Sequence, residues 1–159
     1  MKITIIAVGK VKEKYLQLGI AEFSKRLSRF CKLEFIEVKD ESLTDITTAM
    51  DVERVRQKEG KLILKKILTT AHIVALDIAG KQLTSQQLAE KLGEVGTSGT
   101  SHVIFIIGGS VGLCNKVKNT ADMNLSFSKM TFPHQLSKLM LLEQLFRVFK
   151  IIANEPYHK

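Results

Sequence analysis

Hydrophobic residues follow two alternating patterns along the chain. Short runs that are apolar at nearly every position alternate with longer segments in which apolar residues recur every three or four positions. The first pattern is typical of strands buried on both faces, and the second is typical of amphipathic helices. The predicted strands are residues 2–8, 33–38, 72–77, 103–107 and 123–127. The predicted helices are residues 16–30, 51–68, 84–95, 113–120 (a short helix or turn) and 133–154. This alternation predicts an α/β fold with a mostly parallel five-stranded sheet and right-handed crossovers.

Local signals refine these elements. Gly60 lies inside the second predicted helix and predicts an interruption, because glycine costs about 1 kcal/mol in a helix interior. Residues 79–81 (Ala-Gly-Lys) predict a turn that ends the third strand. Thr84 and Gln87 have the spacing of a capping box and predict the start of the third helix.

Two further segments are polar. Glu34 and Glu37 place charges on the second strand, which indicates a more exposed edge of the sheet. Residues 40–50 are rich in Ser, Thr and Asp, so they predict a loop and a candidate for mobility.

The last predicted helix is apolar around most of its circumference. Only Glu143, Arg147 and Lys150 form a narrow charged stripe. One apolar face can pack on the sheet, and the other predicts a partner, for which a symmetric homodimer is the simplest. The alternative is a helix buried inside its own domain, for which a chain of this size has little room.

Composition narrows the class of protein. The chain has 159 residues, of which 45% are hydrophobic and 25% charged, which predicts one globular domain over residues 1–159. It carries 24 Lys and Arg against 16 Asp and Glu, a net charge of +8. That excess favours a polyanionic partner, either nucleic acid or an anionic membrane; the alternative is a soluble protein that is merely basic.

The cysteines and the lengths of the apolar segments indicate the cellular compartment of the protein. Cys31 and Cys114 are far apart and no Cys/His cluster accompanies them, so we expect two buried free thiols and no metal site. The apolar run at residues 3–8 is too short for the core of a signal peptide, and no stretch approaches the length of a membrane span. We therefore expect a soluble, cytoplasmic protein without a membrane partner.

Two loops are candidates for ligand binding, because ligands of open α/β sheets bind at the carboxyl ends of the strands. The first is the glycine turn 108–112, Gly-Gly-Ser-Val-Gly, after the fourth strand. Its glycines allow a backbone to approach a ligand closely, although the spacing fits neither a dinucleotide site nor a P-loop. The alternative is a tight turn without a ligand.

The second loop, residues 127–132, follows the fifth strand. It mixes apolar side chains with hydroxyls, which suits a neutral aromatic ring such as adenine. The alternative is a helix-capping segment in which Ser128 or Thr131 is the N-cap.

Polar residues of the last helix and the tail could act on a substrate. His134 begins the helix, whose positive end should lower its pKa and keep it neutral as a base; the alternative is a structural histidine. Arg147 is spaced i, i+4 from Glu143, which predicts either a simple ion pair or a guanidinium available to RNA at a dimer seam. Tyr157 and His158 suit stacking on a nucleobase; the alternative is a frayed chain end.

The segments 105–112, 125–151 and 156–159 resemble the RlmH-type ribosomal RNA large-subunit methyltransferases, a family of the knotted SPOUT class. The resemblance extends from the first strand to the last residue, with a looser match over residues 40–70. It implies an α/β fold with a deep C-terminal trefoil knot, an exception to the rule against knots. It also implies S-adenosylmethionine as cofactor and a homodimer with the last helix at the interface.

The resemblance further implies which residues bind the cofactor. Carried over position by position, these are Leu76, Gly108, Phe127, Ser128, Lys129, Met130, Thr131 and Phe132. The residue pattern had already indicated the two loops, whereas Leu76 comes from the resemblance alone.

The implied reaction is methylation of N3 of a pseudouridine in the helix 69 loop of 23S ribosomal RNA on the assembled ribosome. Arg147, Tyr157 and His158 would frame the base, and the tail acts within its own chain or across the dimer. We expect these residues to lie near the two loops, with Arg147 stabilising the imide anion and His158 or His134 assisting deprotonation.

Lysines of the body would supply the contacts to RNA phosphate, with Lys116, Lys118 and Lys129 as candidates. Two competing interpretations remain open at this point. One is a non-enzymatic ribosome-associated binding protein, and the other is a flavodoxin-like nucleotide-binding module.

Overall fold

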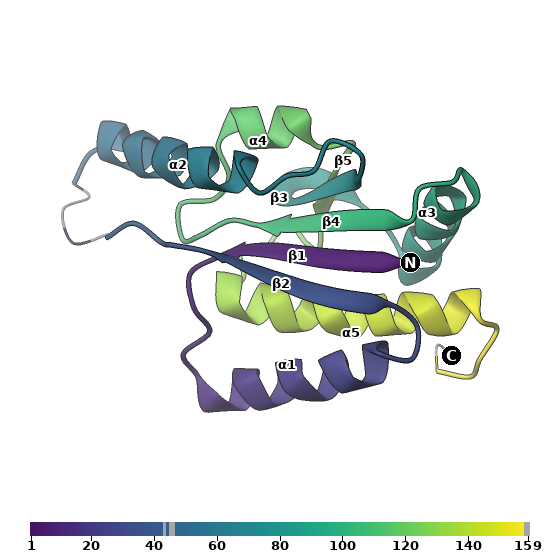
Figure 1. Ribbon diagram of the computed structural model, residues 1–159. Coiled ribbons are helices and arrows are strands. Elements are labelled where there is room, and N and C mark those ends of the chain that lie inside the picture. Colours follow the sequence, from purple (N-terminus) through teal and green to yellow (C-terminus); the bar gives the residue numbers. More distant parts are fainter. Residues whose placement is uncertain (43, 45–46, 158–159) are drawn as a thin grey trace.

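The computed structural model describes residues 1–42, 44 and 47–157 (Figure 1). The strands are β1 (Lys2–Val8), β2 (Lys32–Val38), β3 (His72–Gln82), β4 (His102–Ile107) and β5 (Met123–Ser126). The helices are α1 (Lys14–Leu27), α2 (Ala49–Leu64), α3 (Ser85–Thr97), α4 (Asn115–Thr120) and α5 (His134–Ile152). The strands form one sheet in the order β2-β1-β4-β3-β5, and each pair of neighbours is parallel. The predicted fold class, a five-stranded parallel α/β sheet with β2 at an edge, is confirmed.

The sheet is covered on both faces (Figure 1). Ile3 and Ile5 of β1 belong to a core shared with α1, α3 and α5. Ile6 and Val8 of the same strand belong to a second core, which α2 and α4 cover. Because successive strand residues point to opposite faces, a strand covered on both sides is apolar at nearly every position. This explains why the short apolar runs identified the strands.

The second face of α5 is largely covered within the same chain. Phe146 of α5 packs against Phe23 and Phe30, and the Phe30 ring also stacks on Phe149 at 5.9 Å. On the α1 side, a Cβ placed on Gly19 would lie 3.0 Å from the side chain of Leu139. Because α1 and α3 flank α5 on the sheet, they cover much of this face, and the apolar circumference of α5 does not by itself require a second chain. The homodimer stays a prediction.

Gly60 does not interrupt α2. The helix is continuous over 16 residues and starts with a capping box between Thr48 and Asp51. A Cβ on Gly60 would collide with the sulfur of Cys114. The glycine is therefore a close-packing position, and the predicted break is wrong.

The turn predicted at residues 79–81 is also wrong. β3 continues to Gln82, with a register shift in which both Leu76 and Lys81 pair with Leu125 of β5. A Cβ on Gly80 would lie 2.7 Å from the carbonyl carbon and oxygen of Asn124. Glycine is required because the backbones of β3 and β5 touch here.

The trefoil knot that the resemblance implies stays a prediction.

Several boundaries differ by a few residues from those predicted. α1 ends at Leu27, so Phe30 follows the helix rather than belonging to it. The capping box of Thr84 and Gln87 is confirmed at the start of α3. Within the predicted loop 40–50, residues 43, 45 and 46 lie outside the described part of the chain, and the last two residues belong to α2.

Two other predictions concern cysteines and membrane spans. Cys31 and Cys114 are buried free thiols, as expected. In the described part of the chain, no helix has the length and apolar character needed to cross a membrane.

Candidate functional site

A cavity of about 760 Å³ opens at the carboxyl edge of the sheet. Its walls are residues 76–78 of β3, residues 107–113 at and after the end of β4, and residues 125–128 and 130–134 at the end of β5 and the start of α5. The size falls within the range of sites for small organic ligands. The prediction that the loops after the fourth and fifth strands meet at one edge of the sheet is confirmed, and binding of a ligand there stays a prediction.

Seven of the eight residues predicted to bind a cofactor line this cavity. They are Leu76, Gly108, Phe127, Ser128, Met130, Thr131 and Phe132. The eighth, Lys129, is exposed and does not line the cavity. The structure thus brings the predicted set together, and binding of a cofactor by these residues stays a prediction.

The loop after β5 is shaped by two serines. Ser126 is buried, and its hydroxyl can donate to the carbonyl oxygen of Ile78 at 3.0 Å or of Ser128 at 2.9 Å. The hydroxyl of Ser128 accepts a hydrogen bond from the backbone N–H of Met130 at 3.0 Å. The N-cap of α5 is Pro133, without a side-chain hydrogen bond, so the alternative that Ser128 or Thr131 caps the helix is wrong. Ser126 was missed by the sequence analysis.

The glycine turn 108–112 closes on itself. The N–H of Gly112 donates to the carbonyl of Gly109 at 3.0 Å, and Gly112 has a φ of +76° that favours glycine. A Cβ on Gly108 would lie 3.0 Å from the carbonyl carbon of Gly112. The turn is therefore tight, as the alternative interpretation expected, and it also forms a wall of the cavity.

Two polar residues of α2 contact this turn without lining the cavity. Arg56 Nε donates to the carbonyl oxygen of Val111 at 2.9 Å. Glu59 is only 3% exposed, and a Cβ on Gly109 would lie 3.0 Å from its Oε2. Glu59 Oε1 accepts from the N–H of Glu41 at 3.1 Å, whereas Oε2 has no hydrogen-bond partner among the described residues. Burial raises the pKa of this carboxyl, as do the neighbouring acids.

Neither of these two residues was predicted, although the sequence carried a signal. Arg56 and Glu59 are three residues apart, so they share one face of α2 with Gly60, which packs on Cys114. Polar residues on a buried helix face are unusual, and here they contact the segment 109–114. We infer that α2 holds the glycine turn in the shape that forms the cavity wall.

Replacing Arg56 by alanine is therefore expected to weaken binding of S-adenosylmethionine, the predicted cofactor. A hydrogen bond that involves a charged group contributes about 1.5 to 3 kcal/mol, so complete loss of its effect corresponds to roughly 10- to 150-fold in affinity measured by calorimetry. Arg54→Ala is the matched control, because Arg54 pairs with Asp51 as Arg56 pairs with Glu53 but does not contact the turn. Arg56→Lys should restore part of the affinity. Equal affinities for the Arg56→Ala and Arg54→Ala proteins would contradict a role for Arg56 in holding the turn.

His134 lies in the cavity wall at the first turn of α5. Its Nε2 and the carboxylate of Asp40 approach the same point, 3.5 and 3.6 Å from where a Cβ on Gly9 would be. Burial lowers the pKa of His134, and the nearby Asp40 opposes this effect. The direction agrees with the prediction, but the main cause is burial rather than the helix end. A neutral imidazole at this position can accept a proton.

Arg147 and Tyr157 form a separate cluster on the last turns of α5. Arg147 pairs with Glu143, as the i, i+4 spacing predicted, and its guanidinium lies 4.8 Å from the centre of the Tyr157 ring. The Tyr157 hydroxyl donates to Glu143 at 3.3 Å, and its ring meets the edge of Phe146. The tail thus folds back on α5 as far as Tyr157. His158 lies outside the described residues.

The predicted catalytic residues are not brought together within one chain. Arg147 follows His134 by thirteen residues on the same helix, which corresponds to about 20 Å at 1.5 Å per residue. The expectation that Arg147 lies near the cavity loops is therefore not met in a single chain. Either His134 and the cluster of Arg147 and Tyr157 serve different purposes, or that cluster reaches the cavity of another molecule.

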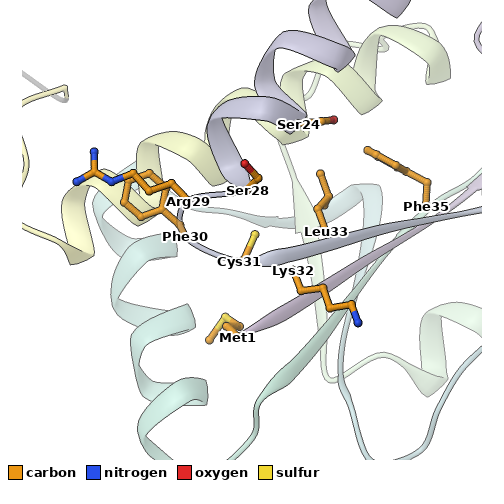
Figure 2. Close-up of a pocket in the computed structure, with 9 residues that line it drawn as sticks. All are labelled: Met1, Ser24, Ser28, Arg29, Phe30, Cys31, Lys32, Leu33 and Phe35. Atoms are coloured by element: carbon orange, nitrogen blue, oxygen red, sulfur yellow. The ribbon is translucent and has the colours of Figure 1, made fainter.

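A second cavity, of about 730 Å³, lies at the opposite edge of the sheet, between the end of α1 and the start of β2. Figure 2 shows Cys31 among the residues that line it, with Met1, Phe30 and Lys32. Burial raises the pKa of Cys31 to about 11, so the thiol stays protonated and unreactive at neutral pH. None of the predicted site residues is found there. The described residues also contain no group of three or more His, Cys, Asp or Glu suited to a metal ion.

Comparisons with known proteins identify the family of this chain. The sequence model of a family described as "Predicted SPOUT methyltransferase" matches residues 1–158. The ribosomal RNA large subunit methyltransferase H of Bifidobacterium adolescentis is 55% identical over 159 residues, which cover 100% of both chains. The protein of the same name from Acetivibrio thermocellus is 53% identical over 159 residues, again 100% of both.

A solved structure supports the fold. It is a probable methylase family protein from Haemophilus influenzae Rd KW20, with a TM-score of 0.57 and 8% sequence identity, over 99% of this chain and 70% of that chain. The family match sets aside the flavodoxin-like and non-enzymatic interpretations. The chain belongs to the SPOUT methyltransferases and, within them, to the ribosomal RNA large subunit methyltransferase H family.

Proposed function

We propose that this chain methylates N3 of a pseudouridine in the helix 69 loop of 23S ribosomal RNA, on the assembled ribosome in the cytoplasm. S-adenosylmethionine is the methyl donor. The observation that carries the proposal is the cavity at the carboxyl edge of the sheet, whose walls contain seven of the eight residues predicted to bind the donor. Membership of the ribosomal RNA large subunit methyltransferase H family supports the substrate class.

The residues in the cavity wall fit the donor chemically. Leu76, Phe127 and Phe132 offer apolar surface for an adenine ring. Gly108 and the loop 127–132 add backbone groups, which can hydrogen-bond a ligand without a charged side chain. When bound there, the donor supplies an electrophilic methyl group.

The chain must then handle the proton and charge of the base. N3 of pseudouridine lies between two carbonyl groups, so its proton leaves as the methyl group arrives and the ring passes through an imide anion. Arg147 stabilises that anion, because a guanidinium donates hydrogen bonds to carbonyl oxygens and is always charged. Tyr157 packs beside the base, and His134 or His158 accepts the proton. His134 is suited to this role because burial keeps its imidazole neutral.

This mechanism requires two chains. Arg147 and His134 are about 20 Å apart along one helix, so they can act on the same base only if they come from different subunits. In a twofold homodimer with antiparallel α5 helices, the end of one α5 lies beside the start of the other. Leu136 and Met140 are only half-buried in one chain and are available to such an interface.

The proposed function is tested by mass mapping of 23S ribosomal RNA from cells that lack this protein. The expected result is loss of one methyl group from a pseudouridine in helix 69, restored when purified protein and S-adenosylmethionine are added to ribosomes from those cells. Free 23S RNA and isolated large subunits are tested alongside, to measure whether methylation needs the assembled ribosome. A methyl group that appears on another base, or on transfer RNA, contradicts the proposal.

A further inference from the structure

Three exposed lysines follow β1: Lys10 and Lys12 lie in the loop between β1 and α1, and Lys14 is the first residue of α1. Within the described residues, none of them forms an ion pair, so their charges are available to a partner. Glu13 lies among them and reduces the formal charge of the group to +2. Tyr15, the next residue, is 68% exposed. An exposed aromatic ring beside unpaired cations is typical of surfaces that bind single-stranded nucleic acid.

The loop is fixed beside the candidate cofactor cavity. The N–H of Lys12 donates to the side-chain oxygen of Gln135 at 2.9 Å, and Gln135 follows His134 of the cavity wall. Gln17 donates to the carbonyl of Val11 at 2.8 Å and holds the loop from the α1 side. The loop is therefore held beside the cavity through Gln135, although none of the three lysines lines the cavity itself.

A fourth lysine borders the cavity on another loop. Lys129 is exposed, and its neighbours Ser128 and Met130 both line the cavity. Lys118, by contrast, is only 27% exposed and pairs with Asp77 at 3.0 Å. Of the earlier candidates for phosphate contact, Lys129 is thus well placed, whereas Lys118 is already occupied.

We propose that the β1–α1 loop and the first residue of α1, through Lys10, Lys12 and Lys14, form the surface that receives the sugar-phosphate backbone of the RNA substrate. This inference rests on the proposed function and names the surface that function needs. RNA is favoured over an anionic membrane because the loop is hydrogen-bonded to Gln135, next to His134 of the cavity wall, and because the exposed ring of Tyr15 offers a surface on which a base can stack. Each phosphate contact releases counterions and makes the slope of log affinity against log salt concentration steeper by about 0.7 to 0.9.

The test compares two triple variants. In the first, Lys10, Lys12 and Lys14 are replaced by alanine. In the matched control, Lys61, Lys65 and Lys66 are replaced, which are also exposed, form no ion pair within the described residues, and lie at the opposite edge of the sheet. Both variants lose three charges. Affinity for ribosomes is measured from low to moderate potassium chloride concentrations, and affinity for S-adenosylmethionine is measured by calorimetry.

In the loop variant, the slope of log affinity against log salt concentration is expected to be less steep by about two to three units. Its affinity for ribosomes at low salt is expected to fall roughly 10- to 100-fold. The control should keep the wild-type slope, and both variants should bind S-adenosylmethionine normally, which shows that they are folded. Equal losses in the two variants, or an unchanged slope in the loop variant, overturn the inference. So does loss of binding to phosphatidylserine vesicles with ribosome binding intact. If the wild-type protein itself fails to methylate ribosomes, the proposed function fails, and this inference fails with it.

Discussion

Arg147→Ala is expected to reduce methyl transfer to ribosomes by about 100-fold or more, while the affinity for S-adenosylmethionine stays unchanged. The reason is that a preorganised charge at the developing anion typically contributes 10² to 10³ in rate. Arg147 is about 20 Å along α5 from the cavity of its own chain, so it cannot support that cavity directly. Single-turnover kinetics measure the transfer step, and calorimetry measures cofactor binding.

Arg26→Ala is the matched control for this experiment. Arg26 also pairs with a glutamate at i, i+4 spacing, Glu22, and its guanidinium also lies over an aromatic ring, that of Phe146 at 5.8 Å. Its replacement removes the same kinds of contact from the neighbouring helix α1. Near-normal transfer by Arg147→Ala, or an equal defect in both variants, would refute a catalytic role for Arg147.

The strands and both cavity loops could be predicted because their signals are local. A strand covered on both faces is apolar at nearly every position, and all five strands were found within a few residues of their observed bounds apart from the extension of β3. Because every pair of neighbouring strands is parallel, the carboxyl ends lie at one edge. The loops after β4 and β5 had to meet there.

The errors at Gly60 and Gly80 have the opposite cause. Glycine weakens a helix or a strand locally, so the sequence predicted a break at each position. In the structure each glycine allows contact with a segment distant in sequence, the sulfur of Cys114 in one case and the backbone of Asn124 in the other. The identity of that partner segment is a tertiary fact, which local propensity does not contain.

The α5 helix shows how one apolar pattern fits two arrangements, cover by the same chain and cover by a partner. Its apolar circumference is real, but α1 and α3 provide most of the second surface, with Phe23 and Phe30 packed on Phe146. A different argument for two subunits follows from the spacing of two residues in the sequence. His134 and Arg147 are thirteen residues apart on one predicted helix, which is too far for both to contact one base.

A subunit-mixing experiment tests that argument, and it starts from two inactive variants. Gly108→Leu should lose cofactor binding, because even a Cβ at this position would lie 3.0 Å from the Gly112 carbonyl carbon and 3.1 Å from Leu113. A larger side chain must therefore displace the turn or enter the cavity. Arg147→Ala should bind the cofactor but not transfer the methyl group. Each variant is checked for folding by thermal melting before mixing.

The purified heterodimer of these two variants is expected to recover about half of the wild-type activity per dimer if each site combines two chains. One of its two sites then has an intact cavity from the Arg147→Ala chain and an intact Arg147 from the Gly108→Leu chain. The reciprocal heterodimer joins a wild-type chain to a chain with both substitutions, and it should be inactive, since every composite site lacks one group. If each site lies within one chain, the two results are exchanged: the first heterodimer is inactive, and the second retains about half. Both heterodimers contain the same two substitutions, which lie on separate chains in the first and on one chain in the second. Their activities therefore report which chain supplies Arg147 to each site.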